Sequence, residues 1–226
     1  MSIEHFFIEE GNGFPLILLH GNGEDHSYFE QQIAFFSSFY RVIALDTRGH
    51  GKTPRGEREF TISQFADDLY EFMLKQNISK AHILGFSDGA NIAMKFAIKY
   101  PEYADKLILN GGNLYPEGVK RSVQIPIELG YKIASFFAGV SNKAKMNTEM
   151  LGLMVNDPNI SLSELKRIMH KTLVIAGTKD MIKEEHTRLI ADTLSDSSLV
   201  FINGDHFIAG KNSTEFNKAV FDFLLQ

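Results

Sequence analysis

The sequence predicts an α/β fold, in which helices cover both faces of a mostly parallel, doubly wound sheet of about seven strands, with a small helical cap. Short apolar runs alternate along the chain with helical patterns, and this alternation is typical of parallel sheets. Each run has an apolar core of four to six residues and ends at Gly, Asp, His or Asn, as expected of strands buried on both faces. The length of 226 residues suits one sizeable domain.

Six apolar runs predict the main strands of this sheet. They lie at 15–20, 40–46, 80–87, 105–112, 171–178 and 197–204. A single short strand, EHFFIEE at 4–10, precedes the first of them, so we expect a slightly trimmed sheet. Two helices have visible starts, because Thr61 with Gln64 and Ser161 with Glu164 each match a capping-box pattern.

Residues 113–170 interrupt the alternation, since they hold helical stretches and no convincing strand. We interpret this segment as a helical cap inserted into a core formed by 1–112 and 171–226; the alternative is an ordinary pair of crossover helices. Within the segment, the apolar run around Phe136 and Phe137 could contact a membrane, but its length and composition favour a role in roofing a pocket.

Composition excludes several classes of function. The net charge is −5 and the basic residues form no run, so no nucleic-acid partner is expected. The absence of cysteine excludes disulfides and thiolate chemistry. The acidic start of the chain does not resemble a signal peptide, and no apolar segment approaches the roughly 20 residues of a spanning helix. We therefore expect a cytoplasmic monomer or homodimer with no membrane partner.

Neither a metal site nor a bound cofactor is expected. The eight histidines are dispersed and none shows H-E-x-x-H spacing, no G-x-G-x-x-G follows a strand, and HGNGED lacks the lysine and the length of a P-loop. His20 and His50 are interpreted as loop-stabilising residues, and Asp46 is expected to pair with Arg48 inside its own loop.

Candidate catalytic side chains follow three of the predicted strands, in the order Ser, Asp, His. Ser87 lies in GFSDG after one strand, Asp180 follows TLVIAG, and His206 follows LVFING. Because ligands bind at the carboxyl ends of strands in open α/β sheets, these three side chains are expected to meet there.

These motifs resemble those of the α/β-hydrolase superfamily. GFSDG is similar to its nucleophile elbow, the chain order of the three side chains matches, and HGNG at 20–23 and DTRGHG at 46–51 resemble its oxyanion and structural loops. The resemblance covers essentially the whole chain. Within the superfamily, GFSDGAN is similar to a segment of the biphenyl hydrolase-like group, which includes valacyclovir hydrolase-type esterases, although Ala90 replaces a glycine of that segment.

The resemblance implies a role for each residue. Ser87 would be the nucleophile, His206 its general base and Asp180 the residue that orients the imidazole, with Asp205 and, less directly, Asp157 as rival orienting acids. The backbone N–H groups of Asn22 and Asp88 would form the oxyanion hole. The residues that would shape an apolar pocket near the triad are Phe86, Met181 and Phe207.

The carboxylate of Asp88 has two interpretations. An acid in the first turn of a helix is favoured by the helix dipole alone. In the biphenyl hydrolase-like group, however, the acid after the nucleophile anchors the ammonium group of aminoacyl substrates. The sequence thus predicts a serine hydrolase that cleaves small acyl or aminoacyl esters, with a weakly catalytic or non-catalytic ligand receptor or a carbon–carbon bond hydrolase as alternatives.

Overall fold

Seven strands form one sheet in the computed structural model, which describes residues 3–226. The spatial order is β1-β3-β2-β4-β5-β6-β7; β1 is antiparallel to β3, and all other neighbours are parallel. This confirms the predicted fold class. The strands are β1 (Phe7–Glu10), β2 (Pro15–Leu19), β3 (Arg41–Leu45), β4 (Ala81–Phe86), β5 (Ala104–Asn110), β6 (Thr172–Gly177) and β7 (Ser197–Ile202).

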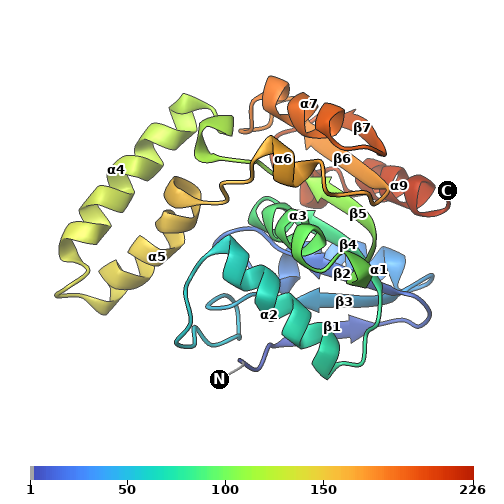
Figure 1. The fold of residues 1–226 in the computed structure, drawn as a ribbon, viewed down its shortest axis with the longest axis horizontal. Coiled ribbons are helices and arrows are strands. Elements are labelled where there is room, and N and C mark those ends of the chain that lie inside the picture. Colours follow the sequence, from blue (N-terminus) through green and yellow to red (C-terminus); the bar gives the residue numbers. More distant parts are fainter. Residues whose placement is uncertain (1–2) are drawn as a thin grey trace.

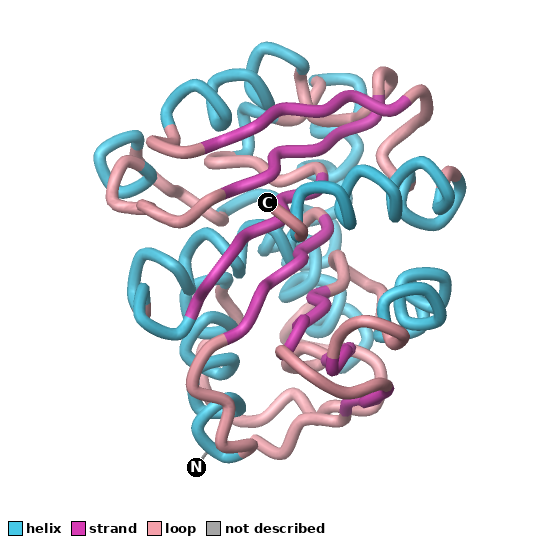
Figure 2. Tube along the Cα trace, turned by 90° about the vertical axis from the view of Figure 1, so that its right-hand side faces the viewer, coloured by secondary structure: helices cyan, strands magenta, loops and turns pink. Residues whose placement is uncertain are grey.

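Helices cover both faces of this sheet, which crosses the middle of the molecule (Figures 1 and 2). One face is covered by α2 (Ile62–Lys75), α3 (Asp88–Lys99), α6 (Leu162–Leu165) and α7 (Glu184–Thr193). The other face is covered by α1 (Glu30–Phe36), α8 (Ile208–Lys211) and α9 (Ser213–Leu224), together with the short 3-10 helix at His26–Phe29. Two further 3-10 turns lie at Pro101–Tyr103 and Pro116–Gly118.

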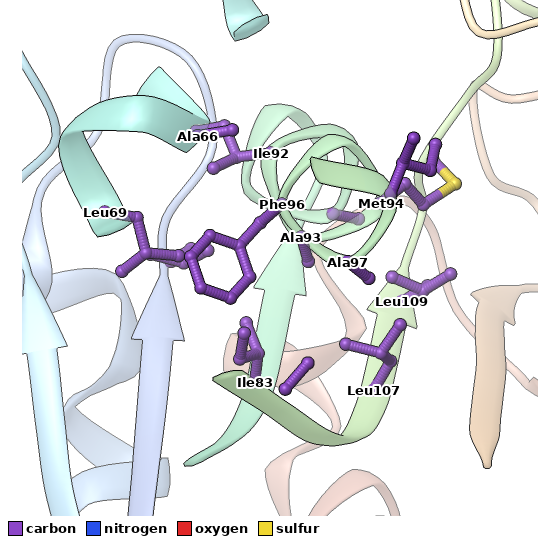
Figure 3. Close-up of a cluster of buried hydrophobic side chains, with 14 of the residues drawn as sticks. Ala66, Leu69, Ile83, Ile92, Ala93, Met94, Phe96, Ala97, Leu107 and Leu109 are labelled. Carbon is purple, nitrogen blue, oxygen red and sulfur yellow. The ribbon is translucent and has the colours of Figure 1, made fainter. Parts of the chain in front are cut away.

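The two cores form because adjacent strand residues point to opposite faces. In β4, Ile83 belongs to the core under α2 and α3, whereas Leu84 belongs to the core under α1 and α9. Figure 3 shows Phe96 of α3 between Leu69 of α2 and Ile83 below it. Helix α3 is therefore buried along most of its length, which fixes the start of the helix next to Ser87.

Between β5 and β6 the chain forms two long helices, α4 (Arg121–Phe137) and α5 (Asn142–Asn156), followed by α6. We call α4, α5 and their connecting turn the helical hairpin. It projects away from the sheet (Figure 1). Helix α5 is bonded to the core, since the side-chain amide of Asn22 donates to the Met150 carbonyl (2.7 Å) and Arg55 pairs with Glu149 (2.8 Å).

Two expectations about side chains in these elements are wrong. Arg48 does not pair with Asp46; its guanidinium forms a buried bidentate pair with Asp68 of α2 (2.6 and 2.7 Å). Asp46 instead accepts hydrogen bonds from His26 and from the Lys52 backbone N–H. Partners on a distant helix cannot be recognised from a local motif.

The second wrong expectation concerns the aromatic pair of the helical hairpin. Phe136 is 82% exposed and Phe137 is also exposed, so Phe136 does not roof a pocket.

The predicted helix starts agree with the structure to different degrees. Ser161 and Glu164 form a complete capping box. Thr61 accepts the Gln64 N–H (3.1 Å), but the Gln64 side chain turns to Asp68, so only half of that box is present. Among the helices of residues 3–226, none combines the length and the apolar character that crossing a bilayer requires.

Candidate active site

Ser87 lies at the sharp turn between β4 and α3, with backbone angles φ 54° and ψ −118°. A non-glycine residue rarely adopts a positive φ, and such strain persists only where the surrounding structure imposes it. Here the Ser87 N–H donates to the Asn110 carbonyl of β5 (2.8 Å), and the Ser87 carbonyl accepts from Ala90 and Asn91 in the first turn of α3. The residue is half-buried, so part of its surface remains accessible at the end of the strand.

The two glycines of GFSDG allow this turn because backbone segments approach there too closely for a side chain. A Cβ on Gly85 would lie 2.2 Å from the Gly89 carbonyl oxygen, and a Cβ on Gly89 would lie 1.9 Å from the Leu19 carbonyl oxygen. The start of α3 therefore packs directly on β2 and β4, as the sequence motif predicts.

Asp180 and His206 are brought together at the same edge of the sheet. Nδ1 of His206 lies 2.7 Å from Oδ1 of Asp180, and both side chains are buried. Asp180 is itself held by the Ile182 N–H (2.9 Å). With Nδ1–H donating to Asp180, the Nε2 of His206 carries the free lone pair of a neutral imidazole. Among the described residues this buried Nε2 has no hydrogen-bond partner, the Ser87 hydroxyl included.

Ser87 and His206 are nevertheless linked through the end of β5. Asn110 accepts the Ser87 N–H, and the next residue, Gly111, has φ 62° and lies against the imidazole. A Cβ on Gly111 would lie 2.7 Å from Cε1 of His206. The ring of Phe86, one residue before Ser87, is centred 4.7 Å from the His206 ring. Catalytic hydrogen bonds are often long or open in structures without substrate, so this arrangement suits a general base.

The rival acids contact other groups. Asp205 binds Lys211 (2.5 Å) and the Phe207 N–H (2.9 Å), and both hydrogen bonds hold the pKa of its carboxyl below the ordinary value. Asp157 lies near Asp88 and not on the imidazole, and burial raises its pKa. Asp180 is therefore the acid that contacts His206.

The HGNG loop is held by buried polar contacts. Nδ1 of His20 lies 2.7 Å from the Gly21 carbonyl, and Nε2 accepts the Thr47 N–H (3.0 Å). Burial lowers the pKa of His20 to about 4, so the imidazole is neutral at pH 7 and can make both contacts. His50 lies beside Thr47 and the Arg48 carbonyl. Both histidines thus contact loops, in agreement with the interpretation from the sequence.

Glu24 is a residue of this loop that the motifs did not single out. Its Oε2 accepts the Gly21 N–H (3.2 Å), while the Glu24 N–H donates to the Gly21 carbonyl (3.3 Å). Burial raises the pKa of Glu24 to about 7. Nearby, Tyr28 stacks on Phe86 at 4.3 Å, and burial raises the pKa of its buried hydroxyl. The only signal in the sequence is an acid three residues after Gly21.

Asp88 is buried at the start of α3. Its Oδ1 accepts from the Asn91 amide (3.3 Å), which also donates to Asn113 (3.0 Å), whereas Oδ2 has no partner among the described residues. Burial raises the pKa of Asp88 to about 6, Asp157 adds to the increase, and the amides of Asn22 and Asn91 offset part of it. A buried, unpaired carboxylate oxygen is costly unless a cation approaches it.

The residues expected to shape a pocket differ in exposure. Phe207 is exposed, with its ring centred 5.6 Å from that of His206. Met181 is half-buried, and its carbonyl accepts the Lys120 N–H (2.9 Å). Phe86 is buried beneath Tyr28, so its contact with His206 is one of packing.

Comparison with known proteins decides the family. The family described as "alpha/beta hydrolase fold" matches residues 15–128, which include the HGNG loop and the GFSDG turn. The chain belongs to the α/β-hydrolase family. Proteins similar to this α/β-hydrolase include serine hydrolase BPHL of Homo sapiens, which is 28% identical over 95% of this chain and 80% of the relative. A putative non-heme chloroperoxidase of Synechocystis is 25% identical over 99% and 95% of the two chains.

Solved structures agree with this fold. A meta-cleavage product hydrolase from Pseudomonas fluorescens IP01 aligns with a TM-score of 0.80 at 24% identity, covering 98% of this chain and 94% of its own. The enol-lactonase of Burkholderia xenovorans LB400 aligns with a TM-score of 0.82 at 20% identity, covering 99% and 97%. At these identities the two structures agree with the α/β-hydrolase fold of this chain over almost its whole length.

Proposed function

We propose that this α/β-hydrolase cleaves carboxylic esters of small acyl or aminoacyl compounds through an acyl-enzyme intermediate on Ser87. The observation that carries the proposal is the strained turn at Ser87 beside a buried His206–Asp180 pair whose Nε2 is free. Serine is a poor nucleophile without a base, and a neutral imidazole oriented by a carboxylate is such a base.

The proposed reaction has two halves. Oγ of Ser87 attacks the ester carbonyl while Nε2 of His206 takes its proton, and the carbonyl oxygen becomes an oxyanion. His206 then gives that proton to the departing alcohol, which leaves an acyl group on Ser87. Water attacks this acyl group in the same way, with His206 again the base, and the acid is released. Asp180 keeps the proton of Nδ1 in place and stabilises the imidazolium in both halves.

The backbone N–H groups of Asn22 and Asp88 are the proposed oxyanion donors. The amide of Asp88 follows the nucleophile, and Asn22 lies in the HGNG loop that Glu24 and His20 hold. Each such donor typically contributes about 3 kcal/mol to transition-state stabilisation. We further propose that residues 113–170 act as a cap, because the Asn22 side chain bonds α5 directly to this loop. No cofactor or metal is required by this mechanism.

Asp88 supports the aminoacyl part of the proposal. Its Oδ2 is buried without a partner and lies one residue from the nucleophile. An α-ammonium group of the substrate would pair with this oxygen and lower the pKa of Asp88 from about 6. BPHL is named as a serine hydrolase, and its similarity over most of both chains supports the reaction class.

A panel of p-nitrophenyl and aminoacyl esters tests the proposal. We expect the wild type to turn over both kinds of ester, and Ser87→Ala to lose at least about 10³-fold in kcat. Absence of turnover in the wild type, or full activity in Ser87→Ala, would contradict the enzyme reaction proposed.

The same panel of esters also tests the proposed contact between Asp88 and the ammonium group of the substrate. Asp88→Asn is expected to lower kcat/KM for aminoacyl esters at least about tenfold, which equals about 1.4 kcal/mol, relative to neutral esters of the same leaving group. The wild type should show the same selective loss below pH 6, where Asp88 is protonated. The neutral ester serves as the control for every effect of pH that does not involve the ammonium group. Equal losses on both esters would reject the ammonium contact and leave the esterase proposal intact.

A further inference from the structure

One face of α4 exposes a continuous apolar stripe. Ile125, Leu129, Ile133 and Phe136 follow each other at intervals of four, four and three residues, and all four side chains are exposed. At about 100° per residue they fall within a single narrow arc of the helix. Val140, in the turn to α5, extends the stripe and is 85% exposed. Contiguous exposed apolar surface of this kind marks an interaction site.

Leu129, Ile133 and Phe136 of the stripe are exposed, whereas Ile125, at the end nearest the sheet, lines a hollow with Val119 and Lys183. The opposite face of α4 packs on α5, where Ala134 is buried and the Gln124 amide donates to the Met154 carbonyl (3.1 Å). Helix α5 in turn is the one that contacts the core, through Asn22 and Arg55. Movement of the helical hairpin toward the sheet would therefore press α5, and not the stripe, against the core.

The charge around the stripe is opposite to that of the whole chain. Residues 121–148 carry four basic side chains and one acid, Glu128, whereas the chain has a net charge of −5. The basic residues are Arg121, Lys132, Lys143 and Lys145, and all of them are exposed. Phe136, Val140 and the lysines lie around the turn between α4 and α5, at the end of the hairpin far from the sheet (Figure 1).

We propose that the end of the helical hairpin docks on an anionic lipid surface, with the apolar stripe entering the headgroup region and the lysines facing lipid phosphates. A helix with an apolar face beside lysines binds in this way, lying in the interface without spanning the bilayer. The charges argue against a second copy as the occupant. A two-fold contact centred on the end of the hairpin would place Lys143 and Lys145 of both copies close to one another, and their like charges would repel. This proposal departs from the expectation, drawn from composition, that the protein has no membrane partner.

Vesicle co-sedimentation tests the proposal on the full chain. Vesicles of phosphatidylcholine alone are compared with vesicles in which about one-third of the lipid is phosphatidylglycerol. We expect the wild type to bind the anionic vesicles and to dissociate as salt is raised. The double variants Phe136→Ser/Val140→Ser and Lys143→Glu/Lys145→Glu should each lower the partition coefficient at least about tenfold.

Matched controls lie on α9 and at its end, away from the hairpin. Leu225 is 68% exposed and Lys218 is exposed, so Leu225→Ser and Lys218→Glu remove comparable groups and should bind as the wild type does. Turnover of a short soluble ester should be unchanged in all four variants, which shows that they are folded and separates this proposal from the proposed activity.

Two results would overturn the proposal. One is a wild type that does not bind anionic vesicles, or hairpin variants that bind as well as the controls. The other is a wild-type dimer in analytical ultracentrifugation that Phe136→Ser/Val140→Ser converts to monomer without any vesicle binding, because the stripe would then be covered by a second copy.

Discussion

At the scale of single residues, two acids near His206 have different partners. Asp180 contacts Nδ1 of His206 at 2.7 Å, whereas Asp205, adjacent to His206 in sequence, turns outward to Lys211. Proximity in sequence therefore does not determine which acid contacts the imidazole of His206. Asp180 follows the end of β6 and contacts the imidazole, whereas the side chain of Asp205, in the turn after β7, is 45% exposed.

Substitution of the two acids should separate their roles. Asp180→Asn is expected to lower kcat by about 10³- to 10⁴-fold, because an amide at this position no longer fixes the Nδ1–H tautomer. Asp205→Asn removes an exposed carboxylate with the same change of group and should lower kcat by less than about threefold. Steady-state kinetics on one neutral ester measures both. A larger loss in Asp205→Asn would assign the orienting role to Asp205.

Some site residues could be predicted from the sequence and others could not. Ser87, Asp180 and His206 follow apolar runs that end at one edge of a parallel sheet, so their place follows from the topology. Glu24 and Asn91 stabilise the site through hydrogen bonds to residues that only the folded chain brings near them. Glu24 accepts the Gly21 N–H, and the Asn91 amide donates to Asp88 and Asn113. Their roles become visible only when those partners are located.

At the scale of elements, the contact between α3 and β2 holds the nucleophile turn. The first turn of α3 rests directly on the carboxyl end of β2, where Gly89 meets the Leu19 carbonyl. The helix cannot move away from the sheet without changing the backbone of Ser87. The same contact therefore determines both packing and the position of the proposed nucleophile.

Adding one methyl group at Gly89 tests this contact. Gly89→Ala places a Cβ about 1.9 Å from the Leu19 carbonyl oxygen, and we expect a loss of about 3 kcal/mol or more in the free energy of unfolding. Gly210→Ala in α8 is the matched control, because no atom lies within 4 Å of its added Cβ. It should change stability by no more than about 1 kcal/mol. Urea unfolding measures both, and equal midpoints would contradict the account.

The elements themselves were largely predictable, and the departures have physical causes. Each of the six main apolar runs forms a strand within one or two residues of its predicted ends, because burial on both faces leaves a clear apolar signal. The first strand, predicted at 4–10, is shorter and spans Phe7–Glu10. The buried face of the helical hairpin is harder to predict, since apolar residues at helical spacing are expected to face inward. Phe136 instead lies on the outer face of α4, and only the placement of α5 decides which face is buried.

At the scale of the whole molecule, several histidines are buried or half-buried in the neutral form. Burial lowers the pKa from its ordinary value of 6.5 to about 4 in four of them, His5, His20, His82 and His186. The unfolded chain therefore takes up protons first as pH falls below about 7, and folding stability decreases from there toward pH 4. Glu24 and Asp88, with pKa values raised to about 7 and about 6, act in the opposite direction.

The histidines outnumber the two opposing acids, so the net effect should be destabilisation by acid. Between pH 8 and pH 5 we expect the free energy of unfolding to fall by about 2 to 3 kcal/mol. Urea unfolding at pH 8, 6.5 and 5 measures this change. Glu24→Gln removes one opposing group, so its stability should fall more steeply than that of the wild type. A stability that is constant or rises toward pH 5 would contradict the buried, neutral state of the histidines.

The central claim is that Ser87 is a nucleophile activated by His206, and covalent labelling tests it most directly. A fluorophosphonate is incubated with the wild type, Ser87→Ala and His206→Ala, and the adduct is located by mass spectrometry of peptides. We predict one label per wild-type chain, on Ser87, no label in Ser87→Ala, and labelling slowed at least about 10³-fold in His206→Ala. An unlabelled wild type, or a label on any other residue, would contradict the account.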